Sequence, residues 1–389
     1  MQLGMLVFPA IERIVYGQSA AQALRIEAER LNKTRVFLIV SGTMNRSTDE
    51  VTKVQNALGS RYAGVYDRIA SHAPRGDVLD AAHAARTANA DLIVTFGGGS
   101  VTDAGKMVRL CLRHDIFDLD RFDAFRVVIN PNGSGYAPDY DGPTVDQIAI
   151  PTTLSAGEFH AEAGCTDHRS KVKHAYRHPA LIPRVIILDP APAKHTPLWV
   201  WLSTGVRAVD HAAEGICSQF SNPLSDSSFL HAIRLLSQAL PRVKRDPTDV
   251  DARLDCQFAI WLSMAGRMAG AKMGASHAIG HVLGGTCGVP HGYTSCIMLS
   301  HVLRYNRSAN ADRQTLIAEA MGHPGDEAAD VIAKFVADLG LPTRLVHVGV
   351  EREQFAAIAA HTMREIWLHV NPRKISHPDQ LLEILGAAA

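Results

Sequence analysis

In the first half of the chain, short apolar runs alternate with helical patterns and glycine-containing turns. Helices are indicated from Gly42 to about Leu58 and at residues 78–88. Strand, turn and helix in alternation are typical of a parallel sheet with helices on both faces. Buried strands are predicted at residues 35–40, 62–66, 91–96 and 148–151, with two or three more within residues 162–189.

The pattern changes beyond Pro197, where alanine- and leucine-rich helical stretches dominate and no further strand is convincing. Residues 114–147 are rich in Asp, Pro, Gly and Asn and read as a loop excursion. A chain of 389 residues is long enough for two domains. We expect an α/β domain with a parallel sheet at residues 1–190 and an all-α domain at residues 191–389.

Composition excludes several classes of partner. Lys plus Arg total 39 and Asp plus Glu total 39, so no net charge attracts nucleic acid or a membrane surface. No apolar run reaches the length of a membrane span, and the first twenty residues contain Glu12 and Arg13 rather than a signal-peptide run. Six cysteines lie scattered without a CxxC pair. That usage fits free thiols in a reducing compartment, so we expect a cytoplasmic protein.

Residues 274–306 contain four histidines, at positions 277, 281, 291 and 301. His277 and His281 are four residues apart and share one face of a helix. A glycine-rich turn follows, and Pro290 then begins a second apolar helix, which lets His291 fold back towards the His277 face. Imidazoles gathered in this way serve a metal, a proton relay or both. The alternative is polar filling of a helical core, but three at this spacing favour a site.

Residues 97–106 join a strand to a helix through three consecutive glycines. Glycines at such a junction let backbone amides approach a phosphate, and the helix N-terminus adds its dipole. The segment is neither a P-loop nor a GxGxxG fingerprint, because Ser100 and Thr102 stand at positions that those motifs give to glycine. We expect a diphosphate cradle of another type. A tight turn without a ligand is the alternative.

A helix at residues 203–219, capped by Ser203 or Thr204, places Arg207, His211 and Glu214 on one face. Asp210 lies beside Arg207 at the i+3 position. The alternative is a surface ladder of ion pairs, each worth less than ~1 kcal/mol. Apolar neighbours along the segment argue against a solvated face.

Together these motifs resemble the iron-containing (group III) alcohol dehydrogenases, nearly from end to end. The family's hallmarks are GGGSxxDxxK, a Pro-Thr-Thr segment, a helix GxDAxxHAxE and a stretch HxxxH…PHG. They stand here at residues 97–106, 151–153, 205–214 and 277–292. The resemblance implies a nucleotide-binding α/β domain, a helical domain, a site in the cleft between them and a homodimer.

Carried over residue by residue, the resemblance implies an NAD or NADP site. The family often has an aspartate that selects NAD just after the strand that residues 35–40 match, but Ser41 and Gly42 stand there, with Arg46 nearby, so NADP is admissible as well. Lys173 matches a lysine that approaches the nicotinamide ribose. Thr152 and Thr153 match residues along the adenine and nicotinamide portions. The implied diphosphate residues are Gly97, Gly98, Gly99, Ser100 and Asp103.

The chain departs from the family at the metal. Three family histidines that bind iron match His211, His277 and His291, but Arg207 occupies the position of the ligand aspartate. A guanidinium stays protonated and repels a cation. Asp210 lies about 100° around the helix from His211 and substitutes poorly.

We therefore expect no metal, as in the related maleylacetate reductases, which residues 151–158 and 371–373 also resemble. The alternative is an iron- or zinc-dependent alcohol dehydrogenase that uses the three histidines alone.

The expected reaction is reversible hydride transfer between nicotinamide and a carbonyl or secondary alcohol. Arg207 and a protonated member of the cluster of His211, His277 and His291 would meet the negative charge that forms on oxygen. His281 is the predicted proton relay to solvent. A fixed arginine would also favour a small substrate that bears a carboxylate. Two alternatives remain open: a nucleotide-binding protein without turnover, and a phosphate-eliminating relative that shares the fold.

Overall fold

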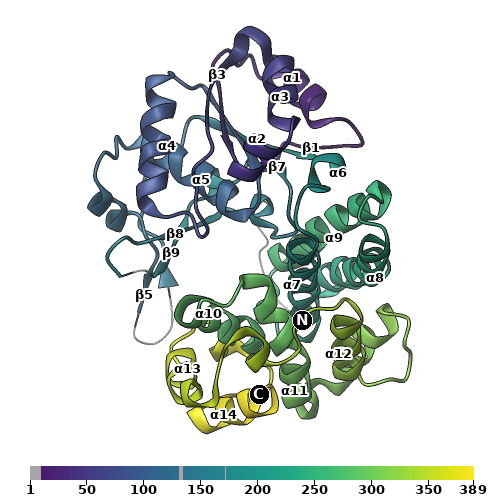
Figure 1. The fold of residues 1–389 in the computed structure, drawn as a ribbon. Coiled ribbons are helices and arrows are strands. Elements are labelled where there is room, and N and C mark those ends of the chain that lie inside the picture. The colour runs from purple at the N-terminus through teal and green to yellow at the C-terminus, as the bar shows by residue number, and fades with distance from the viewer. Residues whose placement is uncertain (1–9, 131–134, 171) are drawn as a thin grey trace. The chain divides into compact units, whose positions relative to one another are not determined.

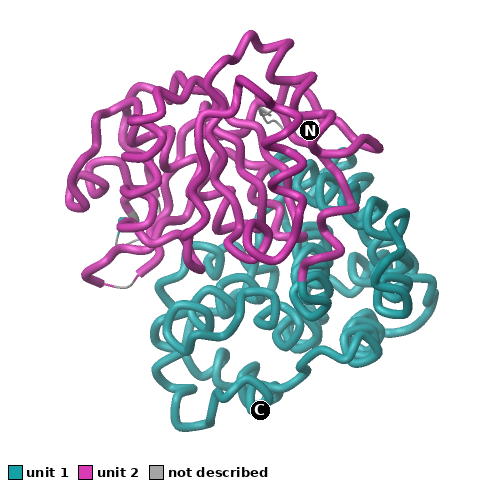
Figure 2. The backbone as a smooth tube through the Cα atoms, turned by 45° about the horizontal axis from the view of Figure 1, so that its top comes forward, with its two compact units in different colours: residues 1–8, 130–134, 197–389 teal, residues 9–129, 135–196 magenta. Residues whose placement is uncertain are grey.

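The computed structural model describes residues 10–130, 135–170 and 172–389. The chain forms two compact units, coloured separately in Figure 2. Among the described residues, one contains residues 10–129 and 135–196, and the other contains residues 197–389. The main passage from one unit to the other falls at Thr196–Pro197, a few residues after position 190.

The first unit is built on a six-stranded parallel sheet, as predicted (Figure 1). Its central strands are completely buried, which explains their continuous apolar sequences. Strand β1 escaped prediction because it is a four-residue edge strand with exposed ends. In spatial order the strands are β1 (Arg13–Tyr16), β10 (Val185–Leu188), β7 (Asp146–Pro151), β4 (Leu92–Gly97), β2 (Val36–Val40) and β3 (Tyr62–Tyr66).

Helices cover both faces of this sheet. Side chains alternate along β2, so that Leu38 joins the core under α1 (Ala20–Arg30) and α3 (Glu50–Leu58). Its neighbour Ile39 joins the core under α4 (Arg75–Thr87) and α5 (Gly99–Arg113). The expected two-faced α/β architecture is confirmed.

Two segments of this unit differ from the simplest expectation. The predicted helix ending near Leu58 is broken at Thr48, whose extended backbone separates α2 (Gly42–Ser47) from α3. The hydroxyl of Thr48 donates to the carbonyl of Met44 and closes the first helix. The predicted excursion at 114–147 contains η2 (Leu119–Ala124) and a short antiparallel pair, β5 (Val128–Ile129) with β6 (Gly135–Tyr136).

Strands β8 (Glu162–Thr166) and β9 (Lys173–Arg177) form a separate antiparallel pair rather than joining the main sheet. The pair packs beside α5 and contributes Cys165 and Tyr176 to the core that α4 and α5 share. The unit is completed by three short 3-10 turns and a last helix: η1 (Gly59–Arg61), η3 (Gly157–Phe159), η4 (Pro179–Leu181) and α6 (Pro190–Ala193).

The second unit is helical, and no strand occurs in the part of it that the structure describes. None of the described helices is long and apolar enough to cross a membrane. Its elements are α7 (Leu198–Cys217), α8 (Pro223–Arg245), α9 (Val250–Met268), α10 (Ala275–Cys287), α11 (His291–Ala320), α12 (Ala328–Asp338), η5 (Leu345–Val348), η6 (Arg352–Gln354), α13 (Phe355–Thr362), η7 (Leu368–Val370) and α14 (Pro378–Ala387).

The start of α7 corrects one prediction. The helix begins at Leu198 after Pro197, so Ser203 and Thr204 are not its caps. Both hydroxyls instead donate to the carbonyl of Val200 inside the helix. The predicted start of the second histidine helix is confirmed, because Pro290 is the N-cap of α11, which continues past Asn306 to Ala320.

Candidate active site

Helix α7 carries four buried ionisable side chains in its second half. Arg207, Asp210, His211 and Glu214 are each less than a tenth exposed. A surface ladder of ion pairs is therefore ruled out for this face. Four ionisable groups this deep in a helical unit require specific partners, since an unpaired buried charge is strongly unfavourable.

Glu214 finds its partners at the start of α10. That helix begins after Gly274, which has no side chain to cap it. The carboxylate of Glu214 accepts the backbone N–H groups of Gly274 at 2.9 Å and Ser276 at 2.8 Å. It also lies 2.8 Å from Nδ1 of His277. Glu214 thus satisfies the free amides of the helix N-terminus and fixes the imidazole of His277.

Asp210 is held by two hydroxyls. Ser276 donates to its Oδ2 at 2.9 Å and Ser295 at 2.6 Å, while Nδ1 of His277 lies 3.5 Å away. The Nη1 of Arg207 donates to the Ser295 hydroxyl at 3.3 Å. Arg207 therefore points into the cluster and is linked to Asp210 through Ser295, not paired with it directly as the i+3 spacing suggested.

His211 and His277 lie face to face, with ring centroids 4.6 Å apart and planes at 28°. Three buried atoms here lack a hydrogen-bond partner among the described residues: Nδ1 of His211, Nε2 of His277 and Oδ1 of Asp210. Unsatisfied buried polar atoms are rare in folded proteins and often mark a place where a ligand binds. Of the three imidazoles predicted to form one cluster, His211 and His277 are in contact.

His281 and His291 form a second pair one turn further along α10. Their rings are 6.0 Å apart, so His291 returns to the histidine face of α10 but stacks on His281. The ring of Trp367 lies 4.1 Å from that of His281 and 5.8 Å from that of His277. Glu365 lies 3.4 Å from Nδ1 of His281.

Sequence reasoning did not assign Trp367, Glu365, Ser276 or Ser295 to the site. Ser276 and Ser295 adjoin predicted site segments, but an isolated serine carries no signal of the partner it will meet. Trp367 and Glu365 lie about 90 residues beyond His277. No local pattern connects segments that far apart.

Burial sets the charge state of the cluster. It lowers the pKa of Arg207 only to about 10, so the guanidinium stays protonated at neutral pH. It raises the pKa of Asp210 and Glu214, and the charge of Glu214 raises that of Asp210 further. Burial, together with neighbouring positive groups, holds the pKa of His211 and His277 well below the usual value. Arg207 is thus the persistent positive charge of the cluster.

In the α/β unit, the glycine turn joins β4 to α5 as predicted. Helix α5 starts at Gly99, and its N-cap, Gly98, provides no side-chain cap. A Cβ at Gly98 would lie 3.0 Å from Thr153, so the turn and the Thr152–Thr153 segment pack closely. Uncapped amides beside glycine backbone are what a diphosphate requires. The hydroxyl of Ser100 accepts a hydrogen bond from the backbone N–H of His72 at 2.9 Å.

Two lysines near α5 have different environments. Lys173 on β9 pairs with Asp103 at 3.1 Å, which joins two predicted cofactor residues. Lys106 is fully buried and donates to three backbone carbonyls, those of Gly157, His160 and Glu162, at 2.6–2.7 Å. Lys106 therefore ties the loop after β7 to α5.

The turn after β2 contains the residues that bear on NAD or NADP. Ser41 precedes α2 without a side-chain capping bond. Arg46 pairs with Asp67 at 3.1 Å, and the side-chain amide of Asn45 donates to the same carboxylate oxygen. A carboxylate therefore lies beside the residues after β2, and it belongs to Asp67, which follows β3.

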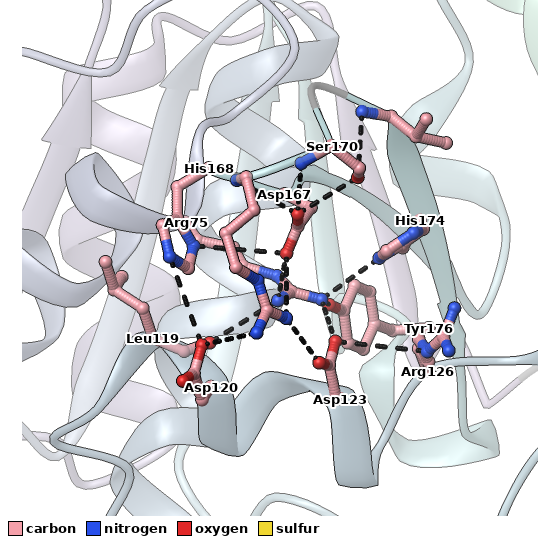
Figure 3. A network of polar contacts seen from close by, with 12 residues as sticks. Arg75, Leu119, Asp120, Asp123, Arg126, Asp167, His168, Ser170, His174 and Tyr176 are labelled. Carbon is pink, nitrogen blue, oxygen red and sulfur yellow. Dashed lines mark hydrogen bonds and ion pairs between the residues drawn. The ribbon is translucent and has the colours of Figure 1, made fainter.

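A buried arginine fixes the β8–β9 pair that carries Lys173 (Figure 3). Arg75, at the start of α4, is completely buried and donates to Asp167, Asp123 and the Tyr176 hydroxyl at 2.5–2.9 Å. Backbone and hydroxyl bonds from Ser170 and the charge of Arg75 lower the pKa of Asp167. Asp123, Asp167 and His174 have the spacing of cation ligands, but the guanidinium already supplies their positive charge.

The two halves of the chain each match a family model. The model "Iron-containing alcohol dehydrogenase" matches residues 11–190, and "Fe-containing alcohol dehydrogenase family, C-terminal" matches residues 201–389. The chain belongs to the iron-containing alcohol dehydrogenase family.

Similar members of the iron-containing alcohol dehydrogenase family include dehydrogenases and reductases. Dehydrogenase FUM7 of Gibberella moniliformis is 34% identical and covers 97% of this chain and 96% of its own. A maleylacetate reductase of a Rhizobium species is 30% identical, and the match covers 89% of this chain and 88% of that protein. The solved maleylacetate reductase of Agrobacterium tumefaciens covers 100% of this chain and 98% of its own, with a TM-score of 0.82 and 27% identity.

These matches confirm the predicted family and its maleylacetate reductase-like subgroup. The protein is an oxidoreductase of the class that acts on alcohol or carbonyl groups.

The family's name implies iron, and the cluster on α7 fits it poorly. Arg207, which stands where the family resemblance implies the ligand aspartate, brings a charged side chain into the cluster. Oδ2 of Asp210 and both oxygens of Glu214 already accept hydrogen bonds. His291 is exposed and stacks on His281, not on the His211–His277 pair. A guanidinium beside the histidines opposes a second positive charge.

Proposed function

We propose that the protein is an NAD(P)-dependent reductase that transfers hydride to a carbonyl carbon, reversibly, without a metal ion. The observation that carries the proposal is the buried, protonated Arg207 in the position of the family's ligand aspartate. It supplies a fixed positive charge where the iron enzymes have a cation. Electrostatic stabilisation of the developing oxyanion is commonly the largest catalytic contribution.

The α/β unit supplies the residues for the cofactor. A nicotinamide dinucleotide, when bound, supplies or accepts the hydride at its ring. The uncapped start of α5, with Gly98 and Gly99, would bind the diphosphate. Asp103 and Lys173 would orient the ribose next to the nicotinamide, with Thr152 and Thr153 along the cofactor. Ser41, Arg46 and Asp67 would decide between NAD and NADP.

The helical unit supplies the residues for the carbonyl. Arg207 donates hydrogen bonds to the substrate oxygen as it becomes an alkoxide. His281, which is partly exposed and pairs with Glu365, delivers the proton that completes the alcohol and recovers one from solvent. His211 and His277 are neutral, because burial lowers their pKa, and therefore orient the substrate as hydrogen-bonding groups.

The same arginine supports a substrate class. A guanidinium binds a carboxylate through two parallel hydrogen bonds, so a small keto acid would be retained better than an uncharged ketone. Relatives named maleylacetate reductase agree with this choice. We propose a carboxylate-bearing carbonyl compound as the substrate class.

The alternative is a metal-dependent alcohol dehydrogenase in which His211, His277 and His291 hold iron or zinc. The unsatisfied Nδ1 of His211 and Nε2 of His277 favour it, because neutral imidazole nitrogens are metal ligands. Asp210, Glu214 and His277 also offer ligand atoms within 4.8 Å of one another.

Metal content and activity decide between the two. We expect the purified protein to contain far less than one iron or zinc per chain and to keep its NAD(P)H-dependent reduction of a keto acid after chelation. Arg207→Asp removes the guanidinium and restores a carboxylate, so it should gain about one divalent ion per chain and lose at least ~100-fold in metal-free kcat.

Arg234→Asp makes the same charge change on an exposed position of α8 and should alter neither quantity. One tightly bound ion per wild-type chain, with activity lost on chelation and regained on reloading, would refute the metal-free reaction.

A further inference from the structure

The helical unit contains a cavity of about 530 Å³ that the proposed reaction does not use. It lies among α11, α12, η6 and the end of α14. Its size suits a small metabolite. None of its described lining residues is Asp or Glu. The polar lining consists of Ser300, His301, Arg304, Thr343, Arg344 and Arg352.

Several polar groups in this lining lack a protein partner. Ser300 is 5% exposed, yet its hydroxyl makes no hydrogen bond to a described residue. Nδ1 of His301 is buried and likewise unsatisfied within the described chain. Arg352, exposed at the rim, has no ion pair with any described residue. Buried polar atoms such as Nδ1 of His301 normally have partners, so a ligand that forms hydrogen bonds would complete this cavity.

The other two arginines are only partly engaged. Arg304 pairs with Asp330 at 2.6 Å through one Nη, and Nε of Arg344 donates to the backbone carbonyl of Ala389 at 2.5 Å. A guanidinium has five N–H donors, so both keep donors for a ligand. His301 is neutral, because burial and then the charge of Arg304 lower its pKa to about 4. The cavity is therefore rich in hydrogen-bond donors.

We propose that this cavity is a binding site for a small oxyanion, such as a phosphate or a carboxylate group. Arg352 would approach the anion from the rim, while the Ser300 hydroxyl and His301 would donate from the floor. Hydrogen bonds between charged groups are the strong ones, and arginine forms two at once with either kind of oxyanion. The site differs from the Arg207 cluster and requires no turnover.

Isothermal titration calorimetry on the full chain tests the site, with inorganic phosphate in one series and succinate in the other at constant ionic strength. We expect saturable binding of at least one of them, and the tighter one identifies the oxyanion class. Arg352→Gln and Ser300→Ala should each weaken it at least about tenfold, since a hydrogen bond to a charged ligand is lost. Arg245→Gln, at an exposed arginine on α8, should bind like the wild type.

Both pocket substitutions are mild, because Arg352 is exposed and serine-to-alanine keeps the shape of the floor; unchanged melting temperatures would confirm the fold. Absence of saturable binding in both series would refute the site. Wild-type affinity in both Arg352→Gln and Ser300→Ala would also refute it, since the anion would then bind elsewhere, for example at the glycine turn.

Discussion

Arg207 changes what the neighbouring histidines can do, because it brings a permanent charge into a buried cluster. His211 and His277 stay neutral beside it, since burial already disfavours their protonation. The side chains of Asp210 and Arg207 are linked by hydrogen bonds through the Ser295 hydroxyl. At the scale of single residues, the proposed reaction thus gives this side chain the role that an ion would have in the iron enzymes.

Another residue-scale feature leads to a pH prediction. Glu158 is 2% exposed, one of its carboxylate oxygens lacks a partner within the described chain, and burial raises its pKa to about 7. The unfolded chain releases this proton near pH 4.5. The contribution of Glu158 to stability is therefore complete below pH 4.5 and is lost as pH rises to about 7, by about 3 kcal/mol.

Glu158→Gln keeps the neutral shape and should remove this loss. Urea unfolding of the wild type and of Glu158→Gln between pH 4.5 and 7.5 measures the effect. The free energy of unfolding of the wild type should fall more steeply with rising pH. Glu353→Gln, at an exposed position, serves as the control. Parallel curves for wild type and Glu158→Gln would contradict the prediction.

Part of the candidate site could be predicted from the sequence. The shared helix face of His277 and His281 was predictable from their i and i+4 spacing, whereas the meeting of His211 and His277 was implied by the family resemblance. The partners of these groups were not predictable. Ser295 and Trp367 reach the cluster through tertiary packing, and no periodicity reports which distant segment a side chain will meet.

At the scale of elements, the β8–β9 pair depends on a single buried guanidinium. Arg75 contacts Asp167 and Asp123, and its removal takes the nearest cation from the buried Asp167, while Arg169 still pairs with Asp123. Breaking a buried ion pair by removal of one partner costs about 3–5 kcal/mol. Arg75→Gln should therefore lower the free energy of unfolding by that amount.

Chemical denaturation measures the effect, with Arg126→Gln as the matched control. Arg126 lies 3.9 Å from Asp123 but is largely exposed, so its loss should cost less than ~1 kcal/mol. Equal losses in both variants would show that burial does not set the strength of this network.

Elements were predictable where local chemistry agreed with the fold. Continuous apolar runs marked β2 and β4, since a parallel strand is buried on both faces. The start of α7 was missed because Ser203 and Thr204 resemble caps. Inside a helix the same hydroxyls bond back to the preceding turn.

At the scale of the whole molecule, a bound cofactor should stabilise the native chain. A ligand at 100 times its dissociation constant adds about 2.7 kcal/mol, which corresponds to a rise of several degrees in melting temperature. Thermal unfolding with NADH and NADPH in separate series should show the rise. The cofactor that produces the larger shift at equal concentration is the preferred one.

Gly98→Ala places a Cβ 3.0 Å from Thr153 and should reduce this shift, since it obstructs the approach to the helix N-terminus. Gly76→Ala adds a Cβ in open space on α4 and should leave it unchanged. A shift of the same size in both variants would place the nucleotide away from the glycine turn.

The N-cap residue of α10, Gly274, provides no capping side chain, so other segments supply the hydrogen-bond acceptors. The backbone N–H groups of Gly274 and Ser276 donate to the carboxylate of Glu214 on α7. The N–H of Ala275 donates to the side-chain oxygen of Asn371, near the C-terminal end of the chain. Because Asn371 accepts the N–H of Ala275, two residues before His277, a substitution at position 371 removes a hydrogen bond from the start of the helix that carries this imidazole. The start of the histidine helix thus depends on side chains from two distant segments of the chain, at positions 214 and 371.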